Sequence, residues 1–167
     1  MTATPTPSQT VGPFFSIGLC ERPRNLLVEP GTPGAVELRG RVLDGSAAPV
    51  PDAVVEIWQA DESGSYRGDF GWGRCETDAT GEFRFTTVEP GVVDKQAPHL
   101  VVLVFARGLL KPVLTRLYFP GNASANDRDP VLSRIAEPAR LVAMRDGADL
   151  RFEIRLQGDG QTPFFAL

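Results

Sequence analysis

The alternation of apolar and polar residues predicts a chain built from short β-strands. In residues 36–42 every second residue is apolar or glycine and the residues between them are charged, which is the pattern of a strand with one buried face. Clusters of Gly, Pro and Asp separate this segment from others like it, as expected of turns. The segments predicted as strands, about six in all, are 36–42, 53–60, 83–86, 100–105, 113–119 and 150–156.

Two segments break the simple alternation. Residues 100–105 are continuously apolar and rich in valine, which predicts a central strand buried on both faces. A short helix is predicted after Asp129, a good N-cap, because Pro130 suits the first helical position and Pro138 ends the segment. The fold class predicted from these elements is all-β, an antiparallel β-sandwich with one short helix.

Length and composition limit the domain organisation. A chain of 167 residues with 42% hydrophobic content is long enough for one buried core and too short for a second domain. We therefore expect one domain over residues 1–167, in which residues 1–35 form an extended N-terminal arm and a connection. The adjacent aromatic residues Phe14 and Phe15 predict that this arm is held on an apolar surface.

The charge excludes some functions. A net charge of −4 and a pI near 5.0 give no basic surface for nucleic acid. The chain begins without a charged and apolar leader and has no run of about 20 apolar residues, so we expect a cytoplasmic protein that does not enter a membrane. In that compartment Cys20 and Cys75 are expected to be reduced thiols.

The run Val-Val-Glu-Ile-Trp-Gln-Ala-Asp-Glu-Ser-Gly-Ser-Tyr at 54–66 resembles the core block of the intradiol ring-cleavage dioxygenases, which open catechols on ferric iron. The resemblance extends over most of the chain from Thr10 to Phe165. Its further blocks, in the same order as in the family, are 40–44, 51–53, 71–74, 77–83, 87–91 and 97–99. The resemblance implies the β-sandwich of that family.

The ligands of the family's iron do not all have a counterpart here. The family site uses two Tyr and two His, whereas this chain has one His and two Tyr. The His-x-His of the family matches His99-Leu100-Val101, the position of one Tyr falls near Val93, and residues 66–71 are too short for the insertion that carries the other. Tyr66 matches a tyrosine that is not a ligand. The resemblance therefore implies no metal site in this chain, and we expect His99 to be structural.

The segments 6–14, 104–108 and 158–165 resemble the iron-free chain of the two-chain members of the family. This resemblance implies a homologous beta chain as partner, with Fe(III) held by that beta chain, and αβ pairs that assemble further. The reaction it implies is cleavage of 3,4-dihydroxybenzoate by O2 to 3-carboxy-cis,cis-muconate. No catalytic residue is expected within this chain alone.

The same resemblance implies the residues that would line the partner's substrate pocket. They are Thr10, Gly12, Pro13 and Phe14 of the arm, together with Arg107. A guanidinium at Arg107 suits an acidic substrate or a developing oxyanion; alternatively, Arg107 only ends its strand.

Other interpretations remain open at this stage. A β-sandwich without a metal could be a non-enzymatic binding module, whose mark would be an exposed aromatic platform, but Trp58 and Trp72 are expected to fill the core. A degenerate paralogue, or a homo-oligomeric dioxygenase with an unusual site, are further alternatives. The carboxylates of Asp61 and Asp78 lie at turns, where Asp bonds its own backbone rather than a cation.

Overall fold

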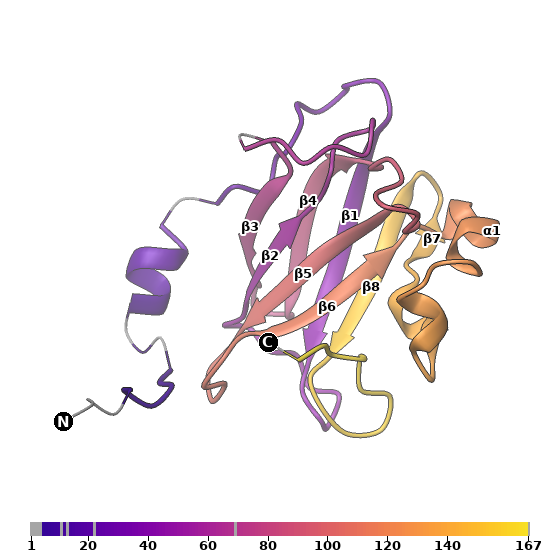
Figure 1. Cartoon of the computed structure of the whole chain (residues 1–167). Helices are drawn as coiled ribbons and strands as arrows, with labels where there is room; N and C mark the ends of the chain where they lie inside the picture. The colour runs from indigo at the N-terminus through magenta and orange to yellow at the C-terminus, as the bar shows by residue number, and fades with distance from the viewer. Residues whose placement is uncertain (1–4, 11, 13, 22, 69, 167) are drawn as a thin grey trace.

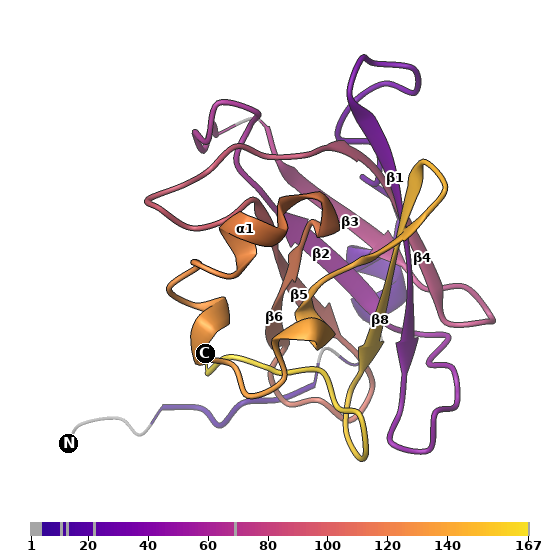
Figure 2. The same ribbon diagram turned by 90° about the vertical axis from the view of Figure 1, so that its right-hand side faces the viewer.

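Two β-sheets packed face to face form the body of the protein (Figures 1 and 2). The computed structural model describes residues 5–10, 12, 14–21, 23–68 and 70–166. One sheet has the strand order β4-β1-β8-β7 and the other β3-β2-β5-β6, so the predicted β-sandwich is confirmed. The strands are β1 (Ala35–Leu43), β2 (Val54–Trp58), β3 (Trp72–Glu76), β4 (Glu82–Val88), β5 (His99–Phe105), β6 (Val113–Tyr118), β7 (Met144–Asp146) and β8 (Asp149–Arg155).

Two details of the sheets differ from the prediction. β3 and β7 were not predicted as strands from the sequence pattern. The pair β1–β8 is parallel, with Leu38 opposite Leu150, whereas every other pair of neighbouring strands is antiparallel. β8 forms a hairpin with β7 at the sheet edge, and the direction of that hairpin leaves β8 parallel to β1.

The main core lies between the two sheets. Its largest members include Phe83 and Phe85 of β4, which are 2% and 0% exposed and pack edge to face. Gly40 of β1 makes room for one of these rings, because a Cβ at this glycine would lie 2.0 Å from Cζ of Phe83. Each buried side chain of this kind contributes roughly 1.5–3 kcal/mol of hydrophobic stabilisation. Other fully buried members are Leu38, Val42, Val55, Ile57, Leu100, Val102, Val104, Leu117, Leu150 and Ile154.

β5 is the central strand that residues 100–105 predicted, since it pairs with β2 and β6. It is not buried on both faces. Leu100, Val102 and Val104 point into the core and are at most 1% exposed. The residues between them, Val101, Leu103 and Phe105, are only partly buried on the outer face. The prediction of a fully buried strand is therefore wrong for the chain by itself.

Short helical segments cover one end of the sandwich, on the right of Figure 1. They are α1 (Ala123–Asn126) and the 3₁₀ helices Pro120–Asn122, Leu132–Arg134 and Pro138–Leu141. Asp129 is the predicted cap, since its Oδ1 accepts hydrogen bonds from the backbone N–H of Val131 and Leu132 at 2.8 and 2.7 Å. The helix after it is a 3₁₀ helix of three residues, shorter than expected, because the backbone is already extended at Ile135. No helix in the described part of the chain is long and apolar enough to cross a bilayer.

The N-terminal arm contains one π-helical turn, Phe15–Leu19. In Figure 1 this turn lies beyond β3, at the left of the sandwich. Phe14 is 70% exposed, so its expected packing on an apolar surface is not made within this chain. The arm joins the sheet at Arg24, which exchanges two backbone hydrogen bonds of 2.9 Å with Arg74 of β3.

Candidate functional site

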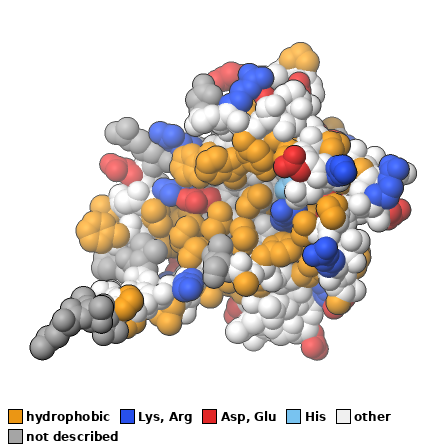
Figure 3. All heavy atoms as spheres, in the orientation of Figure 1, with side chains coloured by type: hydrophobic (Ala, Val, Ile, Leu, Met, Phe, Trp, Pro, Cys, Tyr) orange, Lys and Arg blue, Asp and Glu red, His pale blue; other side chains and the backbone are white. Residues whose placement is uncertain are grey.

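The outer face of the β3-β2-β5-β6 sheet carries most of the residues that the sequence motifs single out. Figure 3 views this face and shows hydrophobic side chains gathered over the sheet. Trp58 of β2 lies opposite Val101 of β5, is 45% exposed and packs on Tyr66, with ring centroids 6.5 Å apart. The prediction that Trp58 fills the core is wrong, because it falls on the outward side of the alternation in β2.

Charged residues cross the same face beside the tryptophans. Glu56 of β2 lies opposite Arg74 of β3, and its Oε1 accepts hydrogen bonds from Nε of Arg74 at 2.7 Å and from Nη2. Trp72 has the guanidinium carbons of Arg74 and Arg24 at 5.1 and 5.5 Å from its ring. Trp72 is therefore also outside the core, flanked by two cations within cation–π range. Sequence reasoning missed this cluster, although the charges of Glu56 and Arg74 between apolar neighbours were a signal for it.

His99 begins β5 and is 5% exposed. Its Nδ1 lies 2.8 Å from the carbonyl oxygen of Ala97, and its ring lies 5.6 Å from that of Tyr118. Burial lowers the pKa of His99 below its usual value, although the bond to Ala97 opposes this shift. The ring is therefore a neutral imidazole whose Nδ1–H donates to the backbone, which is the structural role expected for it.

Tyr118 is fully buried beside His99. Its hydroxyl donates to Oδ1 of Asp129 at 3.2 Å and accepts from Nη1 of Arg116 at 3.2 Å. Burial raises the pKa of Tyr118 to about 12, so this side chain is a neutral phenol at physiological pH. The same carboxylate accepts the backbone N–H of Ala97 at 2.8 Å. The cluster thus ties β5, β6 and the segment after α1 together, and the sequence identified only the capping role of Asp129.

These residues do not fit a ferric ion. Among residues 5–10, 12, 14–21, 23–68 and 70–166, no group of three or more His, Cys, Asp or Glu side chains could hold a metal. Two residues after His99, on the same side of β5, stands Val101, which has no donor atom. Neither tyrosine supplies a phenolate there, since Tyr118 is held neutral and Tyr66 packs on Trp58.

The carboxylates at the turns bind backbone, as predicted. Oδ1 of Asp61 accepts the backbone N–H groups of Ser63 and Ser65 at 2.9 and 3.0 Å. Asp78 does the same for Thr80 and Glu82 at 2.8 and 3.0 Å. Hydrogen bonds from the Ser63 and Thr80 side chains and from these backbone groups lower the pKa of both carboxyls. Both carboxylates therefore stabilise turns.

The two cysteines are free in the structure, and both are partly buried. Burial raises the pKa of Cys20 to about 11, with the neighbouring Glu76 adding to the shift. Burial also raises the pKa of Cys75. Both side chains are therefore protonated thiols near neutral pH, which makes them weak nucleophiles.

The residues predicted to line a substrate pocket belong to two segments, the N-terminal arm and the turn after β5. Thr10, Gly12 and Phe14 are exposed on the arm, and Pro13 lies outside the described residues. Arg107 follows β5, its side chain is 82% exposed, and it forms an ion pair with Asp52. Among the described residues, no hydrogen bond or ion pair joins the arm to Arg107.

Comparisons with known proteins agree with the geometry. A family model described as "Dioxygenase" matches residues 12–158. The alpha chain of protocatechuate 3,4-dioxygenase from Pseudomonas putida is 40% identical over 96% of this chain and 95% of its own length. The beta chain of protocatechuate 3,4-dioxygenase from Burkholderia cepacia is 31% identical over 77% of this chain and 66% of its own length.

A solved structure has the same fold. It is the dioxygenase domain of a dioxygenase–carbohydrate-binding protein fusion from the cellulolytic bacterium Streptomyces sp. SirexAA-E. The identity is 29% and the TM-score 0.65, covering 93% of this chain and 99% of that one. With the sandwich, the motif order and the family model in agreement, this chain belongs to the intradiol ring-cleavage dioxygenase family.

Proposed function

We propose that this chain is the iron-free alpha subunit of a protocatechuate 3,4-dioxygenase. The observation that carries the proposal is the state of β5, which in the family would hold two imidazole ligands. Here the strand offers one buried imidazole whose Nδ1 faces the Ala97 carbonyl, and Val101 at the second position. This chain keeps the family fold and is similar to an alpha chain over nearly its whole length, but its described residues hold no set of metal ligands. It is therefore suited to a supporting role beside an iron-bearing chain.

The proposed partner is a homologous beta chain that holds Fe(III). The outward residues Val101, Leu103 and Phe105 of β5 support a partner on this sheet, because a central strand of a monomeric sandwich normally shows polar residues to water. Leu114 of β6 and Trp58 of β2 extend the same apolar surface.

The pairs of the two chains are proposed to assemble further and to bind neither nucleic acid nor membrane. We place the complex in the cytoplasm, where the free thiols of Cys20 and Cys75 remain reduced.

In this complex the arm residues Thr10, Gly12, Pro13 and Phe14 and the side chain of Arg107 are proposed to line the beta chain's cleft. Iron in the beta chain would supply the chemistry by which O2 cleaves 3,4-dihydroxybenzoate to 3-carboxy-cis,cis-muconate. This chain would supply shape, exclusion of water and a positive charge. The ion pair of Arg107 with Asp52 is exposed and therefore worth little, so the guanidinium is available to a carboxylate.

The test is co-production of this chain with the homologous beta chain of the same organism. Iron content, the visible absorption of tyrosinate-bound iron and oxygen uptake with 3,4-dihydroxybenzoate are measured for each chain alone and for the pair. We expect this chain alone to contain no stoichiometric iron, and the pair to copurify and consume oxygen. Iron and activity in this chain alone, or chains that never associate, would contradict the proposal.

One observation favours a second candidate, a binding module without enzyme activity. The exposed pair Trp58 and Tyr66 forms an aromatic surface of the kind that such modules use. The two proposals differ in what covers this pair, since in the alpha-subunit proposal the beta chain buries it. Solvent quenching of Trp58 fluorescence in a Trp72→Phe variant, where Trp58 is the single tryptophan of this chain, distinguishes them: it falls when the beta chain is added if the pair is interfacial, and is unchanged if it is a free platform.

A further inference from the structure

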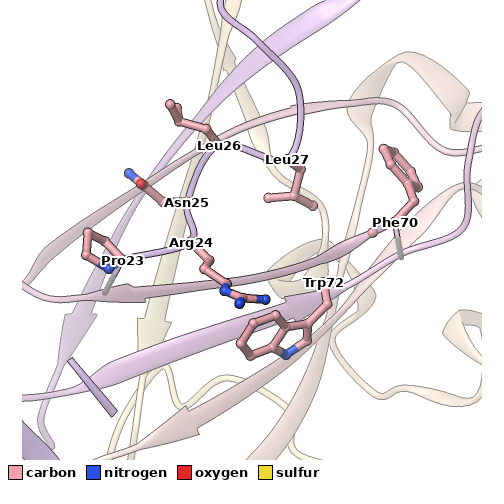
Figure 4. A pocket seen from close by; sticks show the side chains of 8 residues that line it. Pro23, Arg24, Asn25, Leu26, Leu27, Phe70 and Trp72 are labelled. Atoms are coloured by element: carbon pink, nitrogen blue, oxygen red, sulfur yellow. The ribbon is translucent and has the colours of Figure 1, made fainter. Parts of the chain in front are cut away.

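A cavity of about 540 Å³ lies where the N-terminal arm joins the sandwich (Figure 4). Leu26 and Leu27 form one side, Trp72 the other, and Phe70 lies at one end. The head of Arg24 points into the space between Leu27 and Trp72. Neither the alpha-subunit proposal nor any sequence motif gives this cavity a role.

The backbone holds Arg24 firmly in this place. Its N–H and carbonyl bond to Arg74 of β3 at 2.9 Å each, and the next residues continue beside β4, where Leu27 donates to Thr86 at 2.8 Å. The guanidinium carbon of Arg24 lies 5.5 Å from the centre of the Trp72 ring. Stacking engages the flat face of a guanidinium and leaves the N–H groups at its edge free to donate.

The two guanidinium groups beside Trp72 differ in their charge balance. Arg74 is bonded to Glu56, and both side chains are largely buried, at 22% and 12% exposed. Arg24 forms no ion pair with any carboxylate among the residues that the structure describes. Its positive charge therefore lies in the cavity without a carboxylate partner among the described residues.

Such a combination selects a ligand by its chemistry. A guanidinium edge pairs with a carboxylate through two parallel hydrogen bonds, and walls made by Trp72, Phe70 and Leu27 suit a flat ring. A volume of this size lies in the usual range for small-molecule sites. We propose that this cavity binds a small aromatic monocarboxylate, with its carboxylate on Arg24 and its ring among the side chains of Leu27, Phe70 and Trp72. The inference rests on these contacts and is independent of the proposed function.

The test uses the full chain and benzoate, the simplest ligand of this class. The chain has two tryptophans, so Trp58→Phe leaves Trp72 as the single fluorescent reporter. Benzoate is titrated while the emission of Trp72 is followed, and isothermal titration calorimetry gives the stoichiometry. We expect saturable binding of one benzoate per chain, with a change in the emission of Trp72.

Arg24→Gln removes the charge from an exposed side chain and should weaken benzoate binding at least tenfold, because a charge-assisted pair is lost. Arg84→Gln, on the outer face of the other sheet, is the matched control and should leave binding unchanged. Benzamide tests the need for the carboxylate and inorganic phosphate the need for the ring, and both should bind at least tenfold more weakly than benzoate. Trp72→Leu, followed by calorimetry, should also weaken binding.

Several results would overturn the inference. They are the absence of saturable benzoate binding, equal affinity in Arg24→Gln and Arg84→Gln, or phosphate or benzamide binding as tightly as benzoate. Circular dichroism of each variant shows whether the sandwich is intact. No beta chain and no iron take part in this experiment. A negative result with benzoate therefore does not affect the alpha-subunit proposal, and failure of the alpha-subunit proposal does not affect the benzoate test.

Discussion

Glu56 and Arg74 face each other across β2 and β3 on the outer face of the sheet, where one carboxylate oxygen of Glu56 accepts hydrogen bonds from both Nε and Nη2 of Arg74. The pair lies between the apolar Leu103, opposite Glu56 on β5, and Trp72, which Arg74 also contacts. Water reaches only 12% of the Glu56 side chain and 22% of that of Arg74. The two charges therefore depend on each other for stabilisation.

Glu56→Gln should lower the free energy of unfolding by about 2 kcal/mol, because it leaves a partly buried guanidinium without its counter-charge. Urea unfolding followed by circular dichroism measures the change. In the double variant Glu56→Gln/Arg74→Met both charges are gone, so part of the loss should be recovered. Strictly additive losses would show that the two charges are not coupled.

Gly64→Ala should destabilise the chain by about 2–4 kcal/mol. The backbone at Gly64 has φ +80°, and a Cβ there would lie 2.1 Å from the carbonyl oxygen of Val92, so both conformation and space exclude a side chain. Gly68→Ala is the control, because nothing lies within 4 Å of a Cβ at that position. Thermal unfolding should show a clear drop in Tm for Gly64→Ala and a change within about 2 °C for Gly68→Ala.

The sequence predicted the strands that have bulky inward residues and missed those that do not. β3 presents Gly73 and Cys75 to the core, and a Cβ at Gly73 would lie 2.6 Å from Cδ1 of Leu27 and 3.1 Å from Cε1 of Phe85. Large neighbours thus fill the space above a strand that has no apolar alternation of its own. β7 is exposed at all its residues, so it has no buried face to generate a pattern.

The candidate site was less predictable, because an apolar residue looks the same whether its own core or another chain buries it. Leu103 and Phe105 belong to a run that indicates a strand buried on both faces, and the outer face is open in this chain. Trp58 was likewise expected in the core and lies instead on the outer face. Asp129 was identified as a cap, but its bonds to Tyr118 and Ala97 join segments far apart in sequence, which no local pattern reveals.

The stability of the chain should fall as the pH is lowered from about 7 to 5, in part because of His99. Burial lowers the folded-state pKa of His99, whereas the unfolded chain titrates near 6.5. The unfolded state therefore binds the proton first, and the stabilisation present above pH 6.5 is lost as the pH falls toward the folded pKa. The Tyr118 ring lies beside the imidazole and does not titrate in this window, because burial raises the pKa of Tyr118 to about 12.

His99→Asn isolates this contribution, because an amide can still donate to the Ala97 carbonyl and does not titrate. The unfolding free energy of the variant, measured in urea at intervals between pH 7 and 5, should depend less on pH than that of the native chain. Equal slopes in the two proteins would show that His99 accepts its proton in the folded state as readily as in the unfolded state.

Leu103→Lys should weaken association with the beta chain at least tenfold, since an interface that buries this residue would have to bury a charge. The lysine lies opposite Glu56 in the isolated chain, so the fold itself should tolerate it. Met144→Lys is the matched control, an apolar residue that is 65% exposed on the other sheet. Copurification and sedimentation velocity report the complex, and equal behaviour of the two variants would place the interface elsewhere.

Arg107→Ala should lower kcat/KM of the assembled enzyme for 3,4-dihydroxybenzoate roughly tenfold or more, and that for catechol much less, because only the first substrate has a carboxylate to pair with the guanidinium. Asp52→Asn is the control: it removes the same exposed ion pair but keeps the positive charge, so it should leave kcat/KM within about twofold. Both variants should unfold at nearly the native urea concentration, since an exposed pair contributes little to stability. Equal losses with the two substrates would exclude a role directed at the carboxylate, and a loss in Asp52→Asn as large as that in Arg107→Ala would assign the effect to the ion pair instead.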